Sequence, residues 1–171
     1  MRDLNRLSLF LLLLLLSCNL KQGKNEKDGN AGINKAEVID DLDIHAPLFT
    51  PSESPYPLSS AVQVGDVLYL SGLIADAEDG TGVVSGGIIP ETHRIFERLK
   101  ALLARHGIGL DDVFKCTVFL ADMSEWKKFN EVYASYFKAG KYPTRSAMGV
   151  NGLALGARVE IECWAYKPKR N

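Results

Sequence analysis

The sequence predicts an α+β domain in which helices cover one face of a β-sheet. Three segments, 62–72, 113–120 and 158–166, are predicted to be strands, and in 158–166 apolar and polar residues alternate as they do in a strand with one buried face. Between these segments, two stretches have apolar residues at helical spacing. A sheet with helices packed on one side buries both kinds of apolar surface, so this is the fold class that we expect.

Residues 62–72 are expected to form the first hairpin, two short strands joined by a turn at Gly65 and Asp66. The segment that follows, residues 76–87, is rich in glycine and acidic residues and predicts a loop.

A first helix is expected after this loop. Pro90 suits the first turn of a helix, where no backbone N–H is needed, and Gly107 is typical of the position after a helix end. The apolar residues between them form one stripe at helical spacing: Ile95, Phe96, Leu99, Leu102 and Leu103.

Residues 113–120 predict a strand, and a second helix is expected after it. Asp122 or Ser124 can cap this helix, and Gly140 and Pro143 end it. Its apolar stripe resembles that of the first helix: Phe129, Val132, Tyr133, Tyr136 and Phe137.

The last strand is predicted at residues 158–166, where side chains alternate between two faces. One face is apolar and belongs under the helices: Ile161, Cys163 and Ala165. The other has two carboxylates and an indole: Glu160, Glu162 and Trp164. A sheet face of the second kind is commonly closed by a neighbouring subunit.

Arg145 and Glu160 are the first candidates for a functional site. Arg145 is expected in a tight turn at residues 143–146, ahead of the strand with Glu160. A guanidinium offers a rigid fork of donors that matches a carboxylate, and a nearby glutamate can handle water or protons. The alternative is that both are ordinary surface ion-pair residues. Glu162, on the same face as Glu160, is expected to meet a cation such as Arg158.

Several further groups of residues occur in order at characteristic separations: Ser59–Val62, Val64–Asp66, Leu68–Gly72, Gly109–Val113, Lys115–Leu120, Phe129–Tyr133, Pro143–Ser146 and Val159–Ile161. In order and spacing they resemble the RidA/YjgF family of reactive-intermediate deaminases, over most of the chain after Pro57. The resemblance implies a chorismate-mutase-like α+β fold, a mixed β-sheet with two helices on one face. It also implies homotrimers with clefts between subunits.

The resemblance further implies hydrolysis of 2-imino acids to 2-keto acids and ammonia. Arg145 would bind the substrate carboxylate and Glu160 would position the attacking water. Ser71 and Gly72 match the family's Ser-Gly pair beside the ligand, although Ser71 could instead satisfy backbone groups at a strand end. Ala147 stands where the family often has cysteine. Asn130 matches a cleft asparagine, and the alternative is a residue on the helix surface.

No cofactor or metal is implied. A protonated imine is already electrophilic, and His45, His93 and His106 lie far apart without ligand partners at helical spacing. We interpret them as ordinary surface or loop residues.

Some positions depart from the family pattern. Leu58 stands where many members have an aromatic residue, so an aromatic wall is missing there unless Tyr56 supplies it. Leu73 and Ala75 replace a common Gln and Pro. These changes leave open a second function, a non-catalytic lipoprotein that binds small carboxylates. A structural or partner-binding surface lipoprotein is a further alternative.

The N-terminus predicts a secretory leader of the lipoprotein type. Residues 1–17 combine early arginines with an apolar run too short to span a membrane, and Cys18 follows in a lipobox-like context. Cys18 would then be lipidated and would anchor the chain outside the inner membrane; an uncleaved anchor is the alternative. Residues 18–46 predict a flexible polar tether, and residues 47–169 the RidA/YjgF-like domain.

Charge and cysteine content limit the other function classes. The whole chain has 20 basic and 21 acidic residues, and without residues 1–17 a small acidic excess remains. This balance gives no attraction to phosphate backbones, so a nucleic-acid partner is not expected.

Cys116 and Cys163 both lie in predicted strands. We expect separately buried thiols, although a pair within bonding reach would be able to form a disulfide.

Overall fold

The computed structural model describes residues 46–168, and the fold below is that of this part of the chain. The predicted leader, residues 1–17, and nearly all of the predicted tether, residues 18–46, lie outside the described residues, as does Cys18. Among residues 46–168, no helix has the length and apolar character needed to cross a bilayer.

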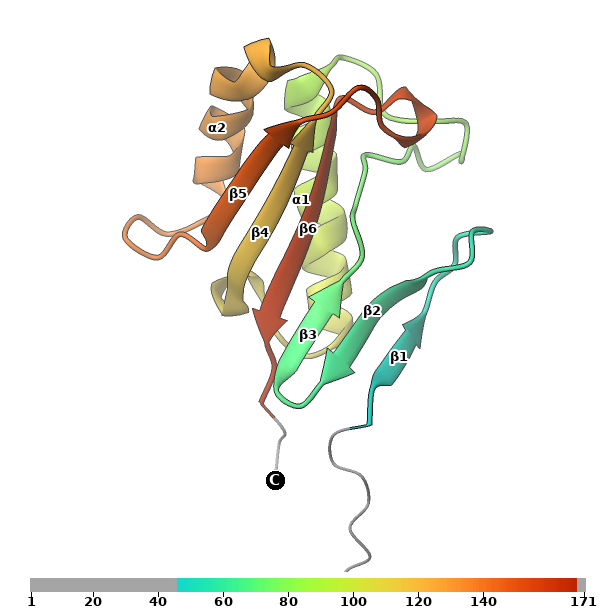
Figure 1. The fold of residues 1–171 in the computed structure, drawn as a ribbon, viewed down its shortest axis with the longest axis vertical. Coiled ribbons are helices and arrows are strands. Elements are labelled where there is room, and N and C mark those ends of the chain that lie inside the picture. Colours follow the sequence, from blue (N-terminus) through green and yellow to red (C-terminus); the bar gives the residue numbers. More distant parts are fainter. Residues whose placement is uncertain (1–45, 169–171) are drawn as a thin grey trace, which may run out of the picture. The chain divides into compact units, whose positions relative to one another are not determined.

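A single mixed sheet organises the described residues (Figure 1). Its strands are β1 (Leu48–Pro51), β2 (Ser59–Val64), β3 (Val67–Leu70), β4 (Val113–Leu120), β5 (Thr144–Gly149) and β6 (Val159–Tyr166). They lie in the order β1-β2-β3-β6-β4-β5. Neighbouring strands are antiparallel except for β4 and β5, which are parallel and are connected through a helix. The predicted hairpin at residues 62–72 corresponds to β2 and β3, which pair through the turn at Gly65.

Two helices pack against one face of this sheet, as predicted. They are α1 (Ile88–Arg105) and α2 (Trp126–Ser135), and Figure 1 looks onto the sheet with α1 behind it. The predicted stripe of α1 is buried throughout, and in α2 Phe129, Val132 and Tyr133 are buried. Asp122 caps the short 3₁₀ turn Met123–Glu125 that leads into α2, where its side chain accepts a hydrogen bond from the Ser124 N–H at 2.8 Å.

The core lies between the helices and the inward faces of the central strands. Its largest fully buried side chains include Phe96, Phe129, Leu68, Ile95, Leu99, Leu103, Leu120 and Ile161. The predicted faces of β6 are confirmed, because Ile161, Cys163 and Ala165 are buried while Glu160, Glu162 and Trp164 are only partly buried on the other side. We call this other side, which no helix covers, the open face.

A bulge in β4 explains how the strand keeps its inward side chains in register. Val113 pairs with Ala165 and Lys115 pairs with Trp164, so Phe114 is an extra residue between them. Val113 is therefore buried, and the burial pattern then resumes at Cys116.

The structure corrects three expectations. Arg145 does not lie in a tight turn but in strand β5, where its register partner is Cys116. Because β5 is an edge strand of the sheet, its sequence is polar and lacks the apolar alternation that would have predicted a strand. Arg158 does not pair with Glu162. Its Nε donates to Glu125 Oε2 at 2.6 Å, because Arg158 precedes β6 and reaches toward the residues before α2.

The third correction concerns the cysteines. Cys116 and Cys163 are not separately buried, because they are direct register partners in the antiparallel pair of β4 and β6.

Strand β1 was not predicted from the sequence at all. It has four residues and a register irregularity between Thr50 and Pro51, so its alternation is too short to be recognised.

Candidate active site

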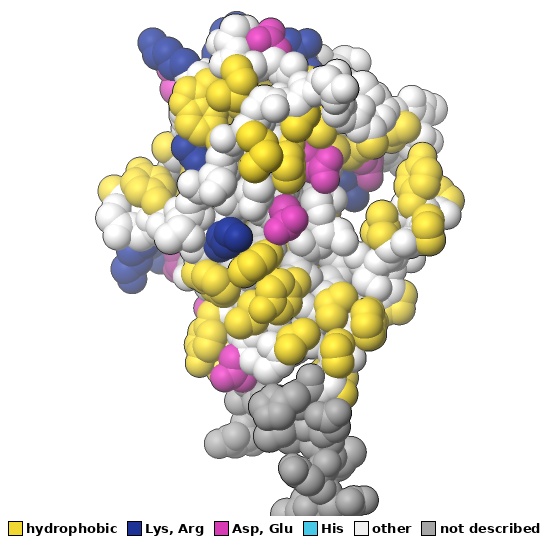
Figure 2. All heavy atoms as spheres, in the orientation of Figure 1, with side chains coloured by type: hydrophobic (Ala, Val, Ile, Leu, Met, Phe, Trp, Pro, Cys, Tyr) yellow, Lys and Arg dark blue, Asp and Glu magenta, His cyan; other side chains and the backbone are white. Residues whose placement is uncertain are grey.

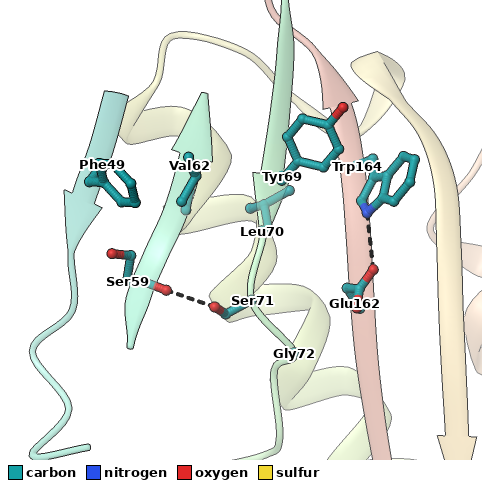
Figure 3. A pocket seen from close by; sticks show the side chains of 10 residues that line it. Phe49, Ser59, Val62, Tyr69, Leu70, Ser71, Gly72, Glu162 and Trp164 are labelled. Carbon is teal, nitrogen blue, oxygen red and sulfur yellow. Dashed lines mark hydrogen bonds between the residues drawn. The ribbon is translucent and has the colours of Figure 1, made fainter. Parts of the chain in front are cut away.

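A shallow cleft of about 590 Å³ lies on the open face over β1, β2, β3 and β6. Its wall is partly aromatic. Phe49, Tyr69 and Trp164 come from three different strands and line the same hollow (Figure 3). The Tyr69 and Trp164 rings meet edge to face with centroids 4.9 Å apart. The cleft thus offers an apolar wall with a few polar groups at the end of β3.

Ser71 and Gly72 lie at that end of the cleft, as Figure 3 shows. The Ser71 hydroxyl donates a hydrogen bond to the Ser59 carbonyl oxygen at 2.7 Å, and the Ser71 N–H donates to the Ser60 carbonyl at 3.1 Å. Ser71 therefore ties the end of β3 to β2, and its hydroxyl oxygen retains acceptor capacity toward the cleft.

Gly72 is required by a close contact with Glu160. A Cβ at position 72 would lie 1.9 Å from Glu160 Oε1 and 2.8 Å from its Cδ. The carboxylate of Glu160 thus occupies the volume that any larger residue at 72 would need. This contact brings together two of the site residues that were predicted from separate motifs.

Glu160 is half-buried on the open face, and no described residue forms a hydrogen bond or ion pair with its carboxylate. Burial is the main cause that raises the pKa of Glu160 above its ordinary value, and the negative charge of Glu162 raises this pKa further. Glu162 itself accepts a hydrogen bond from Trp164 Nε1 at 3.0 Å (Figure 3). A carboxylate with a raised pKa and no partner is suited to hold and deprotonate water.

Arg145 lies in a second, smaller cleft of about 350 Å³ between β5 and α2. Its Nη2 donates a hydrogen bond to Asn130 Oδ1 at 2.7 Å. The guanidinium carbon lies 4.3 Å from the centre of the Tyr133 ring and 4.8 Å from that of Trp126, so aromatic faces fix its plane. No described acidic residue pairs with Arg145, and this leaves donors of the fork for a carboxylate.

The structure therefore divides the predicted site into two halves. Ser71, Gly72 and Glu160 lie on the open face. Arg145 shares the helix-covered face with its register partner Cys116, because directly paired residues of neighbouring strands point the same way. Within one copy of the chain, the guanidinium and the Glu160 carboxylate are on opposite sides of the sheet.

Two further predicted positions fall with the Arg145 half. Asn130 on α2 contacts Arg145 directly, so it is a partner of the guanidinium rather than a simple surface residue. Ala147, two residues after Arg145 in β5, is half-buried against the core on the same face of the sheet. It leaves more room beside Arg145 than a cysteine would.

The departures from the family pattern have different structural consequences. Leu73 exchanges two backbone hydrogen bonds with Ile161, at 2.9 and 3.0 Å, and packs against the core, and Ala75 is fully buried. These two replacements therefore serve packing. Leu58 and Tyr56 are exposed, and the aromatic wall comes instead from Phe49, Tyr69 and Trp164, of which Phe49 lies in a strand, β1, that was not predicted. Strand β1 has only four residues and an irregular register, so no pattern in the sequence indicates Phe49.

Within residues 46–168, no group of three or more histidine, cysteine or acidic side chains is arranged to hold a metal ion. His93 shares a hydrogen bond of 2.8 Å with the Tyr136 hydroxyl on the helix surface, and His106 one of 3.3 Å with the Thr50 hydroxyl. His45 lies outside the described residues.

The chain is similar in sequence to a family model and to several characterised and uncharacterised proteins. Residues 50–167 match the family model described as Endoribonuclease L-PSP. The mouse protein named 2-iminobutanoate/2-iminopropanoate deaminase is 38% identical over 111 residues, which are 65% of this chain and 82% of the mouse protein. A RutC family protein of Pyrococcus horikoshii is 40% identical over 111 residues, 65% of this chain and 87% of that protein.

Solved structures share the fold. YyfA of Yersinia pestis, described as a Rid family protein of unknown function, is 32% identical with a TM-score of 0.65, covering 71% of this chain and 99% of that chain. RidA from an Antarctic Psychrobacter bacterium is 32% identical with a TM-score of 0.62, covering 68% and 93%. The fold class expected from the sequence is thereby confirmed.

Proposed function

The chain belongs to the RidA/YjgF family, and on this basis we propose that it hydrolyses reactive 2-imino acids, or their enamine tautomers, to 2-keto acids and ammonia. The observation that carries the proposal is a complementary pair of unpartnered groups: Arg145 without a described acid beside it, and Glu160 without a described cation. Hydrolysis of a small imino acid needs a cation to bind the substrate carboxylate and a base to activate the attacking water.

In the proposed reaction, Arg145 binds the substrate carboxylate through the donors that Asn130 leaves free. Glu160 accepts a proton from a water molecule as the water oxygen attacks the C=N carbon, giving a carbinolamine. The proton then moves to nitrogen, the C–N bond breaks, and ammonia leaves together with the 2-keto acid. The apolar wall of Phe49, Tyr69 and Trp164 would receive the substrate side chain.

Because Arg145 and Glu160 lie on opposite sides of the sheet, we propose that each active site is shared between two copies of the chain, in a homotrimer. Arg145 stands on the edge strand β5, from which it can reach the open face of a neighbour. Figure 2 shows that hydrophobic side chains gather on the open face, with isolated acidic side chains among them. Exposed Phe114 and Met148 belong to this face, and a second copy would remove them from water.

A second candidate function is binding of a small carboxylate without turnover. It is supported by the Arg145 cleft, which is complete in one copy with Asn130, Tyr133 and Tyr142 around the guanidinium. Such a protein would bind a 2-keto acid tightly and release no ammonia from an imine. Cleavage of RNA is disfavoured, because phosphates on the open face would meet the carboxylates of Glu160 and Glu162.

The test is release of keto acid and ammonia from 2-iminopropanoate and 2-iminobutanoate generated in the assay by an amino-acid oxidase. The wild-type chain is compared with Arg145→Ala and with Glu160→Gln, which preserves size but cannot accept the proton. We expect turnover in the wild type and its loss in both variants. Keto-acid binding with no turnover in any of them would instead support the second function.

We also propose that Cys18 is lipidated and anchors the domain to a membrane on its extracytoplasmic side, facing the periplasm or the cell surface. The support is the leader-like sequence of residues 1–17 and the polar segment after it. Fractionation of cells that produce the full chain should find it in the membrane fraction, and Cys18→Ser should move it out. A membrane association that is unchanged in Cys18→Ser would contradict a lipid anchor.

A further inference from the structure

Two cysteines that the proposed reaction does not use meet in the core. Cys116 in β4 and Cys163 in β6 are direct register partners, and they are 0% and 1% exposed. Their sulfur atoms lie 2.8 Å apart, closer than two sulfurs that are not bonded normally approach. Antiparallel partners also have Cα atoms within the range that a disulfide spans.

The surroundings favour one thiol as the more acidic of the two. The Cys163 S–H next to it is the main cause that lowers the pKa of the Cys116 thiol, and the Tyr133 hydroxyl and the charge of Arg145 lower this pKa further. The Cys163 thiol has a raised pKa because its sulfur faces Cys116 in a buried site. This is the arrangement of a dithiol in which one sulfur attacks and the other follows.

We propose that Cys116 and Cys163 form a disulfide that joins β4 to β6 beside Arg145, on the helix-covered face of the sheet. Two S–H bonds break and one S–S bond forms, and the two electrons and two protons go to a small-molecule or protein disulfide, which becomes two thiols. The Cys116 thiolate attacks that disulfide to give a mixed disulfide, and Cys163 then displaces its second half. Because both sulfurs are buried, the exchange takes place during folding or when β4 and β6 separate.

The cross-link would enclose residues 117–162, the segment that contains both Arg145 and Glu160. Closing this loop restricts the unfolded chain while leaving the paired strands in place, since their register already brings the sulfurs together. The disulfide would therefore favour the fold that positions both halves of the proposed site, and it does not depend on what the site does.

The test uses the full chain with Cys18→Ser, which retains only this pair of the 3 cysteines. The protein is refolded in mixtures of reduced and oxidised glutathione, and in parallel the same mixtures are equilibrated with the chain in urea. Each sample is trapped in acid, unfolded, treated with a maleimide and analysed by intact and peptide mass. We expect a peptide pair joined through Cys116 and Cys163, and a larger cross-linked fraction in the folded chain than in urea at every glutathione ratio.

Two maleimide-labelled cysteines in the folded chain under the most oxidising mixture would overturn the proposal. So would a cross-linked fraction no larger than that in urea, because it would mean that the fold does not bring the sulfurs within bonding geometry. Cys116→Ser in the same background is the matched control. It should retain one labelled or glutathionylated thiol at Cys163 in every mixture, which shows that the reagents detect an unpaired cysteine.

Discussion

Mixing two inactive variants is expected to restore turnover if the site is shared between copies. Arg145→Ala lacks the carboxylate-binding group and Glu160→Gln lacks the proton acceptor, so neither chain alone can assemble a complete site. In a mixed oligomer, the intact Arg145 of one chain can meet the intact Glu160 of its neighbour. The structure predicts this result because the two side chains point to opposite sides of one sheet.

The expected magnitude follows from counting sites. In a closed ring of randomly mixed chains at equal amounts, the chance that one site receives both intact groups is about one quarter, whatever the number of copies. Each variant alone should retain far less. Removing hydrogen bonds to a charged carboxylate costs about 3 kcal/mol, more than a hundredfold in kcat/KM. A recovery to about a quarter of wild-type turnover would therefore stand well above the background of either variant.

The assay needs exchange of subunits. The two full-length variants are unfolded together and refolded, or produced together with different affinity tags and purified through both. Keto-acid release is then compared with that of each variant refolded alone. If mixed oligomers form, as shown by retention of both tags, and turnover stays at the level of the single variants, then the site does not combine Arg145 and Glu160 from different copies.

Three further outcomes are expected. Glu162→Gln should move the acid limb of the pH profile of kcat/KM to lower pH. Catalysis needs ionised Glu160, so activity is lost as the pH falls through the raised pKa of Glu160. Removing the negative charge of Glu162 lowers this pKa, while burial still holds it above its ordinary value. Asn130→Ala should raise KM about tenfold with little change in kcat, because it removes the hydrogen bond at 2.7 Å that orients Arg145 in binding, worth about 1.5 kcal/mol. Gly72→Ala should lower kcat, measured under saturating substrate, because its Cβ would displace the Glu160 carboxylate.

Matched controls accompany the last two variants. Gly152→Ala adds the same methyl group where no atom lies within 4 Å, so it should leave turnover unchanged. Asn130→Asp places a carboxylate beside Arg145 that competes with the substrate, so it should raise KM more than Asn130→Ala does. An unchanged kcat in Gly72→Ala would mean that Glu160 works from another position than the one that it occupies here.

Periodicity in the sequence was sufficient for the elements that bury one complete face. Strands β4 and β6 and helix α1 each present a regular apolar series to the core, so their existence and approximate bounds could be predicted. The two edge strands could not. β1 is short and irregular, and β5 begins with polar Thr144, Arg145 and Ser146 because it borders the sheet and not its centre.

The charged candidate residues were easier to identify in the sequence than their relative placement was to predict. Arg145 and Glu160 were identified as the charged candidates from motifs close to each other in sequence. Their placement on opposite faces depends on the register of β5 against β4, and a shift of one residue would reverse it. Alternation within one strand contains no information about that long-range register, so the separation of the two groups follows only from the structure.

The contact between Gly72 and Glu160 sets limits on how this cleft can evolve toward other substrates. Position 72 cannot accept another residue in this arrangement, because the Glu160 carboxylate fills the space that a Cβ would occupy. Phe49 is different: it is 68% exposed on the outermost strand and borders the same cleft. If the proposed reaction holds, substitutions on β1 can change the size of the accepted side chain while Gly72 and Glu160 stay fixed, so that specificity and chemistry diverge independently in this domain.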